Sequence, residues 1–325
     1  MKYLVTGGGG FIGSHLAKYL CSAKNEVVVL DNFSTGRREN LKGVPVELIE
    51  GDIRDLSTLA KAVKGVDVVF HEAALCSVAR SIEDPLSTHE VNITGTLKVL
   101  EASRRAGVKR VVFASSSSVY GDADALVKHE NLPTVPLSPY AVSKLTGEYY
   151  CRLYTELFGL ETVALRYFNV FGPRQHPDSD YAAVIPKFLM AIRKGRRPQI
   201  YGDGSQTRDF TYVDNVVMAN IAAASSAAAA GSVMNVACGE RWSLLELIGE
   251  LESILHCNIV PEFRAQRAGD IKHSLAGIEK AEKLLGYVPA VRFDEGVRKT
   301  VAWFFAADQN ALAVKPPALM AVTSG

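Results

Sequence analysis

The 325-residue chain has little net charge, few cysteines and no long apolar run. Its 36 lysines and arginines almost balance 35 aspartates and glutamates, and a formal charge of +1 argues against binding to nucleic acid or to an anionic membrane. The five cysteines are scattered without C-x-x-C spacing, which argues against a disulfide framework and a zinc site. No apolar stretch reaches the length of about 20 residues that a membrane-spanning helix needs. We therefore expect a soluble cytoplasmic protein with reduced thiols and no bound metal.

The first feature with chemical meaning is a glycine-rich stretch near the start of the chain. Residues 2–6 predict a short strand, Gly7, Gly10 and Gly13 follow at intervals of three, and residues 14–23 predict a helix. In a dinucleotide-binding turn, the first glycine permits the tight turn, the second lets the backbone approach a pyrophosphate, and the third lets the helix pack on the sheet. The helix N-terminus offers N–H groups and a positive dipole end to the phosphates.

An acidic residue, Asp31, ends the next predicted strand, which covers residues 26–31. A carboxylate at this place accepts hydrogen bonds from the ribose hydroxyls of an adenosine, and its charge repels a 2′-phosphate. Glycine clusters also occur in flexible loops, but the order of strand, turn, helix and second strand favours a dinucleotide site. The sequence therefore predicts NAD as a cofactor.

Apolar segments alternate with helical patterns through the first half of the chain, which is typical of a parallel sheet with helices on both faces. The predicted strands cover residues 2–6, 26–31, 46–50, 66–71, 110–114 and 161–168, and the predicted helices cover 14–23, 56–63, 89–106 and 140–157. From Gly172 the pattern is looser, with helices predicted over 184–193, 213–224, 244–255, 278–285 and 293–305 and short strands over 199–201 and 233–236.

These patterns predict an α/β fold with two lobes. We expect a Rossmann-like doubly wound parallel sheet over residues 1–171, with later segments near 211–238 returning to it. Residues 172–307 would form mainly a smaller α/β substrate-binding lobe, and residues 308–325 a loosely ordered tail.

A tyrosine and a lysine, Tyr140 and Lys144, lie four residues apart in the predicted helix 140–157 and therefore share one helix face. A phenol with the ordinary pKa of about 10 is a poor base at neutral pH. A nearby ammonium and a cationic nicotinamide would stabilise the phenolate and lower that pKa. The alternative is an amphipathic helix with an ordinary tyrosine and a solvated lysine, but the other motifs make the pair a catalytic candidate.

Four serines, at residues 115–118, directly follow the predicted strand 110–114. Ligands of such sheets bind outside the carboxyl ends of the strands, where a hydroxyl can bridge a substrate and the tyrosine. The alternative is a polar loop whose hydroxyls bond to the backbone.

With these motifs combined, the chain resembles the extended short-chain dehydrogenase/reductase family, and within it the nucleoside-diphosphate-sugar 4-epimerases. The matching motifs run in order from about residue 1 to residue 305, at 6–14, 31–36, 51–53, 71–74, 92–96, 115–121, 136–140, 166–174, 201–204, 207–210 and 267–270.

The resemblance implies a role for each residue that matches a family motif. Tyr140 would be the acid/base, Ser116 the catalytic serine and Lys144 the residue that binds the nicotinamide ribose. The cofactor would contact Gly7, Gly10, Phe11, Ile12, Gly13, Asp31, Asn32, Ser34, Thr35, Gly36, Asp52, Ile53, Ala73, Ala74, Asn92, Tyr140 and Lys144. A UDP-sugar would contact Ser116, Ser117, Asn169, Ala183, Val184, Lys187, Tyr201, Arg208, Arg267, Asp270 and Ser274.

The two arginines of that set suit a diphosphate, because a guanidinium offers two parallel donors to phosphate oxygens. The alternative for Arg208 and Arg267 is surface solvation.

Two serines separate this chain from other members of the family it resembles. Similar dehydratases carry Asp-Glu before Val-Tyr-Gly, and similar uronate decarboxylases keep a glutamate there, whereas this chain has Ser117 and Ser118. A hydroxyl is too weak an acid/base for such an elimination. The sequence therefore favours NAD-dependent C4 epimerisation of a UDP-hexose through a 4-keto intermediate. The alternatives are a nucleotide-sugar reductase or dehydrogenase and a uronate-sugar epimerase.

The resemblance also implies the sugar and the assembly. It places Ser274 at the wall that faces the sugar's C2 substituent, where a small residue leaves room for an N-acetyl group. We therefore expect UDP-N-acetylglucosamine and UDP-N-acetylgalactosamine as substrates, with UDP-glucose and UDP-galactose as the second pair. A homodimer is expected, in which the helices 89–106 and 140–157 pair with their copies in a four-helix bundle.

Overall fold

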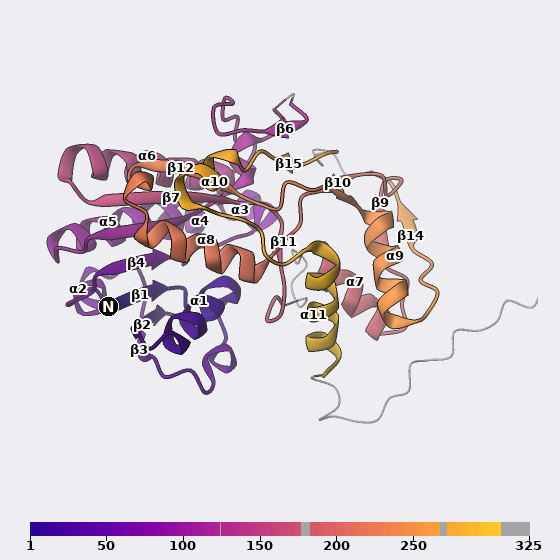
Figure 1. Ribbon diagram of the computed structural model, residues 1–325, viewed down its shortest axis with the longest axis horizontal. Helices are drawn as coiled ribbons and strands as arrows, with labels where there is room; N and C mark the ends of the chain where they lie inside the picture. Colours follow the sequence, from indigo (N-terminus) through magenta and orange to yellow (C-terminus); the bar gives the residue numbers. More distant parts are fainter. Residues whose placement is uncertain (124, 177–182, 267–271, 307–325) are drawn as a thin grey trace, which may run out of the picture.

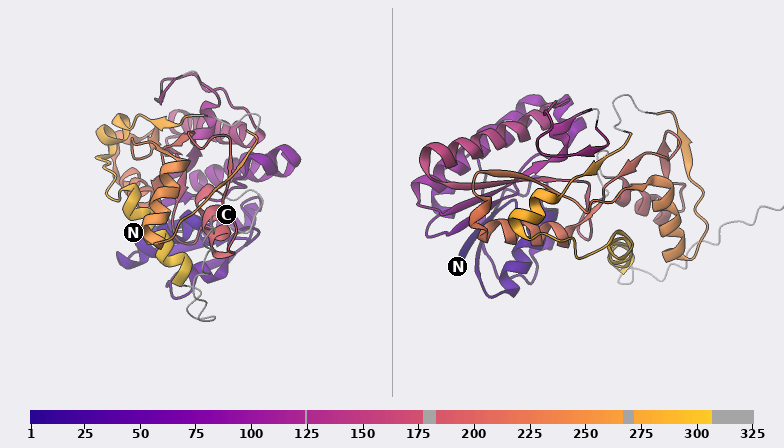
Figure 2. Two further views of the ribbon diagram at one scale, coloured as in Figure 1. Left: turned by 90° about the vertical axis from the view of Figure 1, so that its right-hand side faces the viewer. Right: turned by 45° about the horizontal axis from the view of Figure 1, so that its top comes forward.

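The computed structural model describes residues 1–123, 125–176, 183–266 and 272–306. Within these ranges the chain forms a larger lobe around a seven-stranded sheet and a smaller lobe of helices and short strand pairs (Figure 1). A second direction of view shows the same separation, with the smaller lobe beyond one end of the sheet (Figure 2).

The large sheet is entirely parallel, and its order β12-β7-β5-β4-β1-β2-β3 reverses beside the first strand. The chain runs outward from β1 to β2 and β3 and then crosses to β4 on the other side. Such a reversal opens a crevice at the carboxyl ends of β1 and β4, where doubly wound sheets bind ligands. The predicted Rossmann-like fold is confirmed. The strands are β1 (Lys2–Thr6), β2 (Glu26–Asp31), β3 (Glu47–Glu50), β4 (Val68–His71), β5 (Arg110–Ser116), β7 (Glu161–Tyr167) and β12 (Ser232–Val236).

Helices cover both faces of this sheet, which explains why its strands are apolar almost throughout. Val5 and Phe70 lie in a core with α1 (Phe11–Ser22) and α8 (Val213–Ser225), whereas their neighbours Leu4 and Val69 lie in a separate core on the opposite face. That opposite face is covered by α2 (Leu56–Ala62), α5 (Gly95–Arg105) and α6 (Pro139–Phe158).

Two late segments of the chain lie on the large sheet. Strand β12 pairs in parallel with β7, and α10 (Glu279–Leu285) packs against β12 and α8. Ala281 of α10 and the nearby Tyr287 are buried in the core shared with α1, and the Tyr287 hydroxyl donates to the Ala237 carbonyl (2.9 Å). The chain thus returns to the first lobe twice, at β12 and at α10, before α11 (Phe293–Ala306) joins the smaller lobe.

The helix predicted over residues 89–106 is one segment of a longer, irregular path. The structure has α3 (Val78–Glu83), α4 (Pro85–His89), a π-helical turn over Glu90–Thr94 and then α5. The predicted helix is confirmed, but its first turn is π-helical, which apolar periodicity does not reveal. Such π-turns frequently mark functional sites.

The smaller lobe is held together by aromatic packing. The rings of Phe171, Phe210 and Phe293 contact one another, and Trp242 stacks on Phe293 with 4.6 Å between ring centroids. Its helices are α7 (Val184–Arg193), α9 (Leu244–Leu255) and α11 (Phe293–Ala306). The short strands pair as β9 (Gln199–Tyr201) with β14 (Glu262–Arg264), β10 (Thr207–Arg208) with β13 (Trp242–Ser243), β8 (Val170–Phe171) with β11 (Thr211–Tyr212) and β6 (Val127–Lys128) with β15 (Leu275–Ala276).

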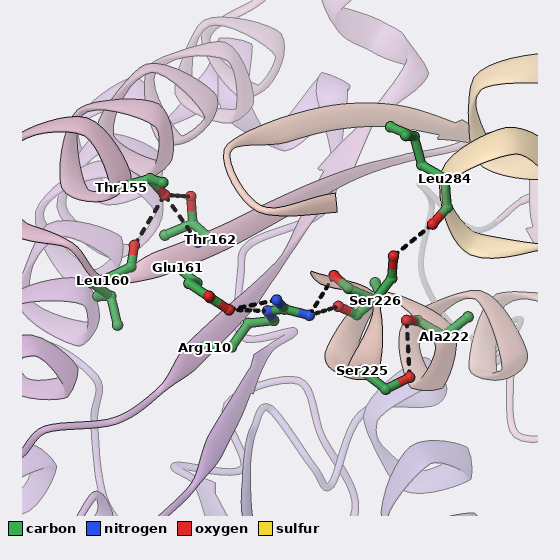
Figure 3. Close-up of polar contacts among 10 residues, drawn as sticks. Arg110, Thr155, Leu160, Glu161, Thr162, Ala222, Ser225, Ser226 and Leu284 are labelled. Atoms are coloured by element: carbon green, nitrogen blue, oxygen red, sulfur yellow. Dashed lines mark hydrogen bonds and ion pairs between the residues drawn. The ribbon is translucent and has the colours of Figure 1, made fainter. Parts of the chain in front are cut away.

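At the amino end of the sheet, Arg110 fastens β5 to β7 and to the end of α8 (Figure 3). Its buried guanidinium donates to the Glu161 carboxylate (3.0 Å from Nε) and to the carbonyls of Ala223 (2.9 Å) and Ser226 (2.8 Å). These contacts are structural, whereas ligands of such sheets bind at the opposite end, where the strands have their carboxyl ends.

Across the described part of the chain, no helix is both long enough and apolar enough to span a membrane. The same residues contain no cluster of histidine, cysteine and acidic side chains arranged to hold a metal ion.

Candidate active site

The glycine turn after β1 is packed so closely that side chains do not fit. Gly7 has a φ of +71°, and a Cβ there would lie 2.7 Å from the backbone nitrogen of Ala73. A Cβ on Gly13 would lie 2.9 Å from the Cα of Gly8. Gly10 is the N-cap residue of α1 and provides no side-chain cap, so the N–H groups of the first turn face outward from a bare backbone. This arrangement fits the diphosphate of a dinucleotide.

Asp31 lies beside this turn as predicted for a ribose acceptor. Its carboxylate accepts hydrogen bonds from the backbone N–H groups of Gly9 (2.8 Å) and Phe33 (2.7 Å). A Cβ on Gly36 would lie 3.0 Å from that carboxylate, so the loop between them leaves no spare volume. A carboxylate has about four acceptor positions, and two remain for ribose hydroxyls.

Three further predicted cofactor contacts, Asn32, Asp52 and Ile53, lie after the carboxyl ends of β2 and β3. The Asn32 side chain donates a hydrogen bond to the Asp52 carboxylate (2.9 Å), and the Arg54 guanidinium donates two more (2.9 and 2.7 Å). The Arg54 hydrogen bonds lower the pKa of Asp52 to about 2. Ile53 is buried, and a Cβ on Gly95 would lie 2.6 Å from its Cδ1. Arg54 was not among the predicted residues, although a positive charge directly after the motif at residues 51–53 could have indicated a partner for Asp52.

Ser34 and Thr35 complete the loop between Asn32 and Gly36. The Asn32 side chain accepts from the Ser34 N–H (3.0 Å), a local turn that shapes the loop. Thr35 is exposed at its tip.

A buried histidine links β1 to the π-turn. His71 contacts the Thr6 hydroxyl through Nδ1 (2.8 Å) and the Thr96 hydroxyl through Nε2 (2.9 Å). The Thr96 hydroxyl donates to the Asn92 carbonyl (2.6 Å), so it must accept from Nε2–H. Burial lowers the pKa of His71 to about 3, which keeps the ring neutral. These hydrogen bonds connect the carboxyl ends of β1 and β4 to the π-helical turn that contains Asn92.

Asn92 supports the loop that carries Ala73 and Ala74. Its amide oxygen accepts from the Leu75 N–H (2.8 Å), and its amide nitrogen donates to the Leu75 carbonyl (3.0 Å) and the Ser143 hydroxyl (3.1 Å). The side chain is buried, so a direct contact with the cofactor stays a prediction, whereas the support of this loop is observed.

Tyr140 and Lys144 lie on the buried face of α6, next to the carboxyl ends of the sheet strands. Ser138 caps the helix by accepting from the Ala141 N–H (3.2 Å), and the Tyr140 N–H donates to the Ser81 hydroxyl (3.1 Å). The Lys144 ammonium donates to the Ala114 carbonyl (2.7 Å) and lies 5.8 Å from the centre of the Tyr140 ring. Both side chains are buried.

The electrostatics of the protein alone differ from the sequence-based expectation. Burial raises the pKa of Tyr140, and its hydrogen bond with the Ser116 side chain only partly offsets that effect. Burial likewise lowers the pKa of Lys144. The ammonium one turn away therefore does not by itself make the phenol acidic, and the predicted lowering depends on the charge that a bound cofactor adds.

Ser116 stands at the junction of β5 and the following 3-10 turn, η3 (Ser117–Tyr120). Its hydroxyl accepts from the Ser118 N–H (3.2 Å), and the Ser116 side chain acts on the Tyr140 phenol to lower its pKa against the effect of burial. The strand register places Ser116 opposite Tyr167 of β7. Ser117 begins the turn, and the Ser118 hydroxyl is buried without a hydrogen-bond partner among the described residues. The structure thus brings Ser116, Tyr140 and Lys144 together as predicted by the motifs.

A buried ion pair behind the serine strand was missed by sequence reasoning. Arg166 of β7 donates to both carboxylate oxygens of Glu148 on α6 (2.8 and 2.7 Å), and Ser115 donates to the same carboxylate. Glu148 lies one turn after Lys144, so the ion pair fixes the helix that carries Tyr140 and Lys144 against β7. The Ser115 hydrogen bond ties the same carboxylate to β5, the strand that ends in Ser116. The sequence did contain an indication of this pair, because a charged residue such as Arg166 inside an apolar strand needs a buried partner.

The predicted sugar-nucleotide contacts come from several parts of the smaller lobe. Ala183 is the N-cap residue of α7, where Val184 and Lys187 form the first turn, and Tyr201 ends β9. Asn169, with a φ of +34°, donates to the Asp209 carbonyl (3.1 Å). Arg267 and Asp270 lie outside the described residues.

The segment around Ser274 lies along β10, which contains Arg208. The Ser274 N–H donates to the Thr207 carbonyl (3.1 Å), and Arg208 donates to the carbonyls of Thr207 (2.9 Å) and Lys272 (3.3 Å). The backbone of Ser274 is thus held next to the residue before Arg208, a contact between distant parts of the chain that no local pattern indicates.

Asp209 fastens this region to the large sheet and was also missed. Its carboxylate accepts from the N–H groups of Cys238 (2.9 Å), Gly239 (3.1 Å) and Ala276 (3.2 Å). Burial raises the pKa of Asp209 to about 7. Because Asp209 follows Arg208 directly, it holds that arginine's strand near the carboxyl end of β12.

A glycine turn at the switch point, together with a serine, tyrosine and lysine at the carboxyl edge, defines a dinucleotide-dependent enzyme of the short-chain dehydrogenase/reductase type. Comparison with known families then identifies the branch. The model of the NAD dependent epimerase/dehydratase family matches residues 3–237, and the chain belongs to this family.

Individual relatives agree with this assignment. A putative UDP-glucose 4-epimerase of Methanocaldococcus jannaschii is 39% identical over 302 residues, which cover 92% of this chain and 97% of the relative. The structure of a UDP-N-acetylglucosamine 4-epimerase from Methanobrevibacter ruminantium M1 in complex with UDP-N-acetylmuramic acid is similar with a TM-score of 0.90 and 42% identity, over 94% of this chain and 98% of that one. A UDP-glucuronate 4-epimerase of Thermodesulfobacterium geofontis is 33% identical over 93% of this chain and 95% of its own length.

Proposed function

We propose that this NAD-dependent UDP-sugar 4-epimerase interconverts UDP-N-acetylglucosamine and UDP-N-acetylgalactosamine. The choice of sugar rests on the family resemblance, which assigns Ser274 to the wall facing the sugar's C2 substituent. The observation that supports it is that the Ser274 backbone lies on Thr207, the residue before Arg208, so that a small side chain stands next to the predicted diphosphate contact. The name of the Methanobrevibacter relative, at 42% identity, supports the same choice. UDP-glucose and UDP-galactose are the second candidate pair, because a site with room for an acetamido group would also admit the smaller hydroxyl.

In this proposal Tyr140 exchanges the proton of the sugar 4-hydroxyl, and Ser116, whose side chain favours the phenolate of Tyr140, bridges the two oxygens. Lys144 holds a positive charge beside the phenol. Positioning and a tuned base are what the protein contributes to such chemistry. The chemistry that NAD supplies when bound is the reversible acceptance of the hydrogen at C4.

In this proposal the smaller lobe binds the nucleotide, and the larger lobe carries the residues that act on the sugar. Arg208 and Lys187 would neutralise the diphosphate, and Asn169 would contact the substrate next to it. With the nucleotide anchored by the smaller lobe, the 4-keto sugar is free to turn and present its other face at the edge of the large sheet.

The experiment that tests the function incubates the purified protein with UDP-N-acetylglucosamine, UDP-glucose and UDP-glucuronate separately, without added reductant. Chromatography resolves the C4 epimers, and nicotinamide absorbance reports net oxidation or reduction. We expect the C4 epimer of UDP-N-acetylglucosamine without net change in the cofactor. A reductase or dehydrogenase would instead consume or release reduced cofactor. Conversion of UDP-glucuronate alone would favour the uronate epimerase.

We also propose a homodimer that pairs α6 and the preceding helical segment with their copies. Tyr149, Leu153 and Leu157 leave an apolar stripe exposed along α6, with Tyr149 51% and Leu157 67% exposed, and Leu86 of α4 is exposed as well. A symmetric partner would bury this stripe.

A further inference from the structure

Glu72 lies at the topological switch point of the sheet, directly after β4. A Cβ on Gly7 would lie 3.0 Å from the backbone carbonyl carbon of Glu72, so this residue adjoins the glycine turn. Its carboxylate accepts from the Tyr167 hydroxyl (2.8 Å), and that hydroxyl in turn accepts from the Asn220 amide (2.8 Å). Three elements, the β4 loop, β7 and α8, therefore hold one carboxylate at the crevice.

This carboxylate has no cation within ion-pair distance among the described residues. The contrast is Glu148, which is 4% exposed and fully paired with Arg166. Glu72 is half-buried, and a carboxylate partly withdrawn from water with no cation in direct contact is costly. Burial raises the pKa of Glu72 to about 7, although the more distant Lys144 acts in the opposite direction. A carboxylate that lacks a cation in contact at a ligand crevice is a place for a cationic ligand group.

The charged and titratable groups that face Glu72 are few. Lys144 of α6 lowers the pKa of Glu72, and Glu72 raises the pKa of Tyr140 on the same helix. Tyr167 of β7 and Cys76 of the β4 loop are its other titratable neighbours, and α8 contributes the uncharged Asn220. The carboxylate is therefore electrostatically coupled to both groups beside which a nicotinamide has to lie.

We propose that Glu72 is a charge-balancing residue whose carboxylate, held by Tyr167 and Asn220, stabilises the oxidised, cationic form of the bound dinucleotide over the reduced, neutral form. This role sets how far the cofactor stays oxidised between turnovers. It rests on the use of NAD and on the Tyr140–Lys144 site, and it is independent of which sugar is converted.

The test measures the dissociation constants of NAD⁺ and NADH for the full chain freed of cofactor, with no sugar present. For Glu72→Gln we expect the preference for NAD⁺ over NADH to fall by about tenfold, because one charge next to the cation is lost. In the unsubstituted protein that preference should also fall as the pH drops through about 7, the pKa of Glu72, whereas Glu72→Gln should show no such dependence. Glu161→Gln is the matched control, since it removes a carboxylate at the opposite edge of the sheet.

An equal loss of affinity for both forms in Glu72→Gln would overturn the proposal, because it would indicate a structural role only. An unchanged ratio would overturn it as well. If Glu72→Gln does not fold, the variant Tyr167→Phe provides the test. It keeps the Glu72 carboxylate but removes its hydrogen-bond donor, which raises the pKa of Glu72. The pH at which the preference for NAD⁺ is lost should therefore move upward. A midpoint that does not move would refute the role of this carboxylate.

Discussion

Removal of the cation from the buried Glu148–Arg166 pair should cost more stability than removal of the whole pair. Arg166→Met leaves a carboxylate that is 4% exposed, and breaking a buried pair in this way costs about 3–5 kcal/mol. The double variant Arg166→Met/Glu148→Gln removes both charges and leaves neutral groups that still reach Ser115. We expect it to recover most of that loss, because the desolvated charge is gone.

The pH dependence of the free energy of unfolding provides a second, independent test of this prediction. Without Arg166, the buried Glu148 carboxylate has lost its counter-charge, and desolvation penalises only its charged form. The stability deficit of Arg166→Met should therefore be small at low pH and grow as the pH rises. The double variant has no carboxylate here and should show no such trend.

Urea unfolding followed by circular dichroism at several pH values measures both effects. The reasoning would be refuted by a double variant that is as unstable as Arg166→Met, or by a deficit that is constant with pH. Either result would show that the cost comes from lost packing around Tyr120, over whose ring Arg166 lies at 4.7 Å, and not from an unpaired charge.

Four further predictions concern the site and the assembly. Tyr140→Phe should abolish activity while folding and NAD content stay near normal, because only the proton-transferring oxygen is lost, and retention of most turnover would contradict its role. Asp31→Arg should weaken NAD binding, measured as cofactor retained after purification, and unchanged retention would remove Asp31 from the cofactor site. Ser274→Tyr should reduce turnover of UDP-N-acetylglucosamine and spare UDP-glucose, by about 1–3 kcal/mol in relative kcat/KM; equal loss on both sugars would exclude Ser274 as the wall. Light scattering should show a dimer at micromolar concentration, and a monomer would contradict the exposed α6 stripe as an interface.

Features that depend on a few consecutive residues could be predicted from the sequence. Gly7, Gly10 and Gly13 specify their turn locally, because the backbone conformation and close approach require glycine. Tyr140 and Lys144 share a helix face through their spacing alone. The parallel sheet followed from its apolar strands, and the structure confirms it.

Features that depend on distant segments could not be predicted in this way. The π-turn before Gly95 differs from a helix by one widened turn, which apolar periodicity does not register. Glu72 meets Tyr167 and Asn220 only because three separate elements end at one crevice. The ion pair of Glu148 required the register of β7 against α6, which only tertiary packing sets. Such polar contacts are fixed by topology and not by neighbours in the chain.

The most direct test of the central claim uses UDP-N-acetylglucosamine that carries deuterium at C4 of the sugar. The protein, with the NAD that it retains and no added reductant, is incubated with this substrate in ordinary water, and the products are analysed by chromatography and mass spectrometry. We expect UDP-N-acetylgalactosamine that keeps the deuterium at C4, because the hydrogen removed from one face returns to the other without exchange with solvent. Absence of the epimer, or an epimer that has lost the deuterium to water, would contradict the proposed function.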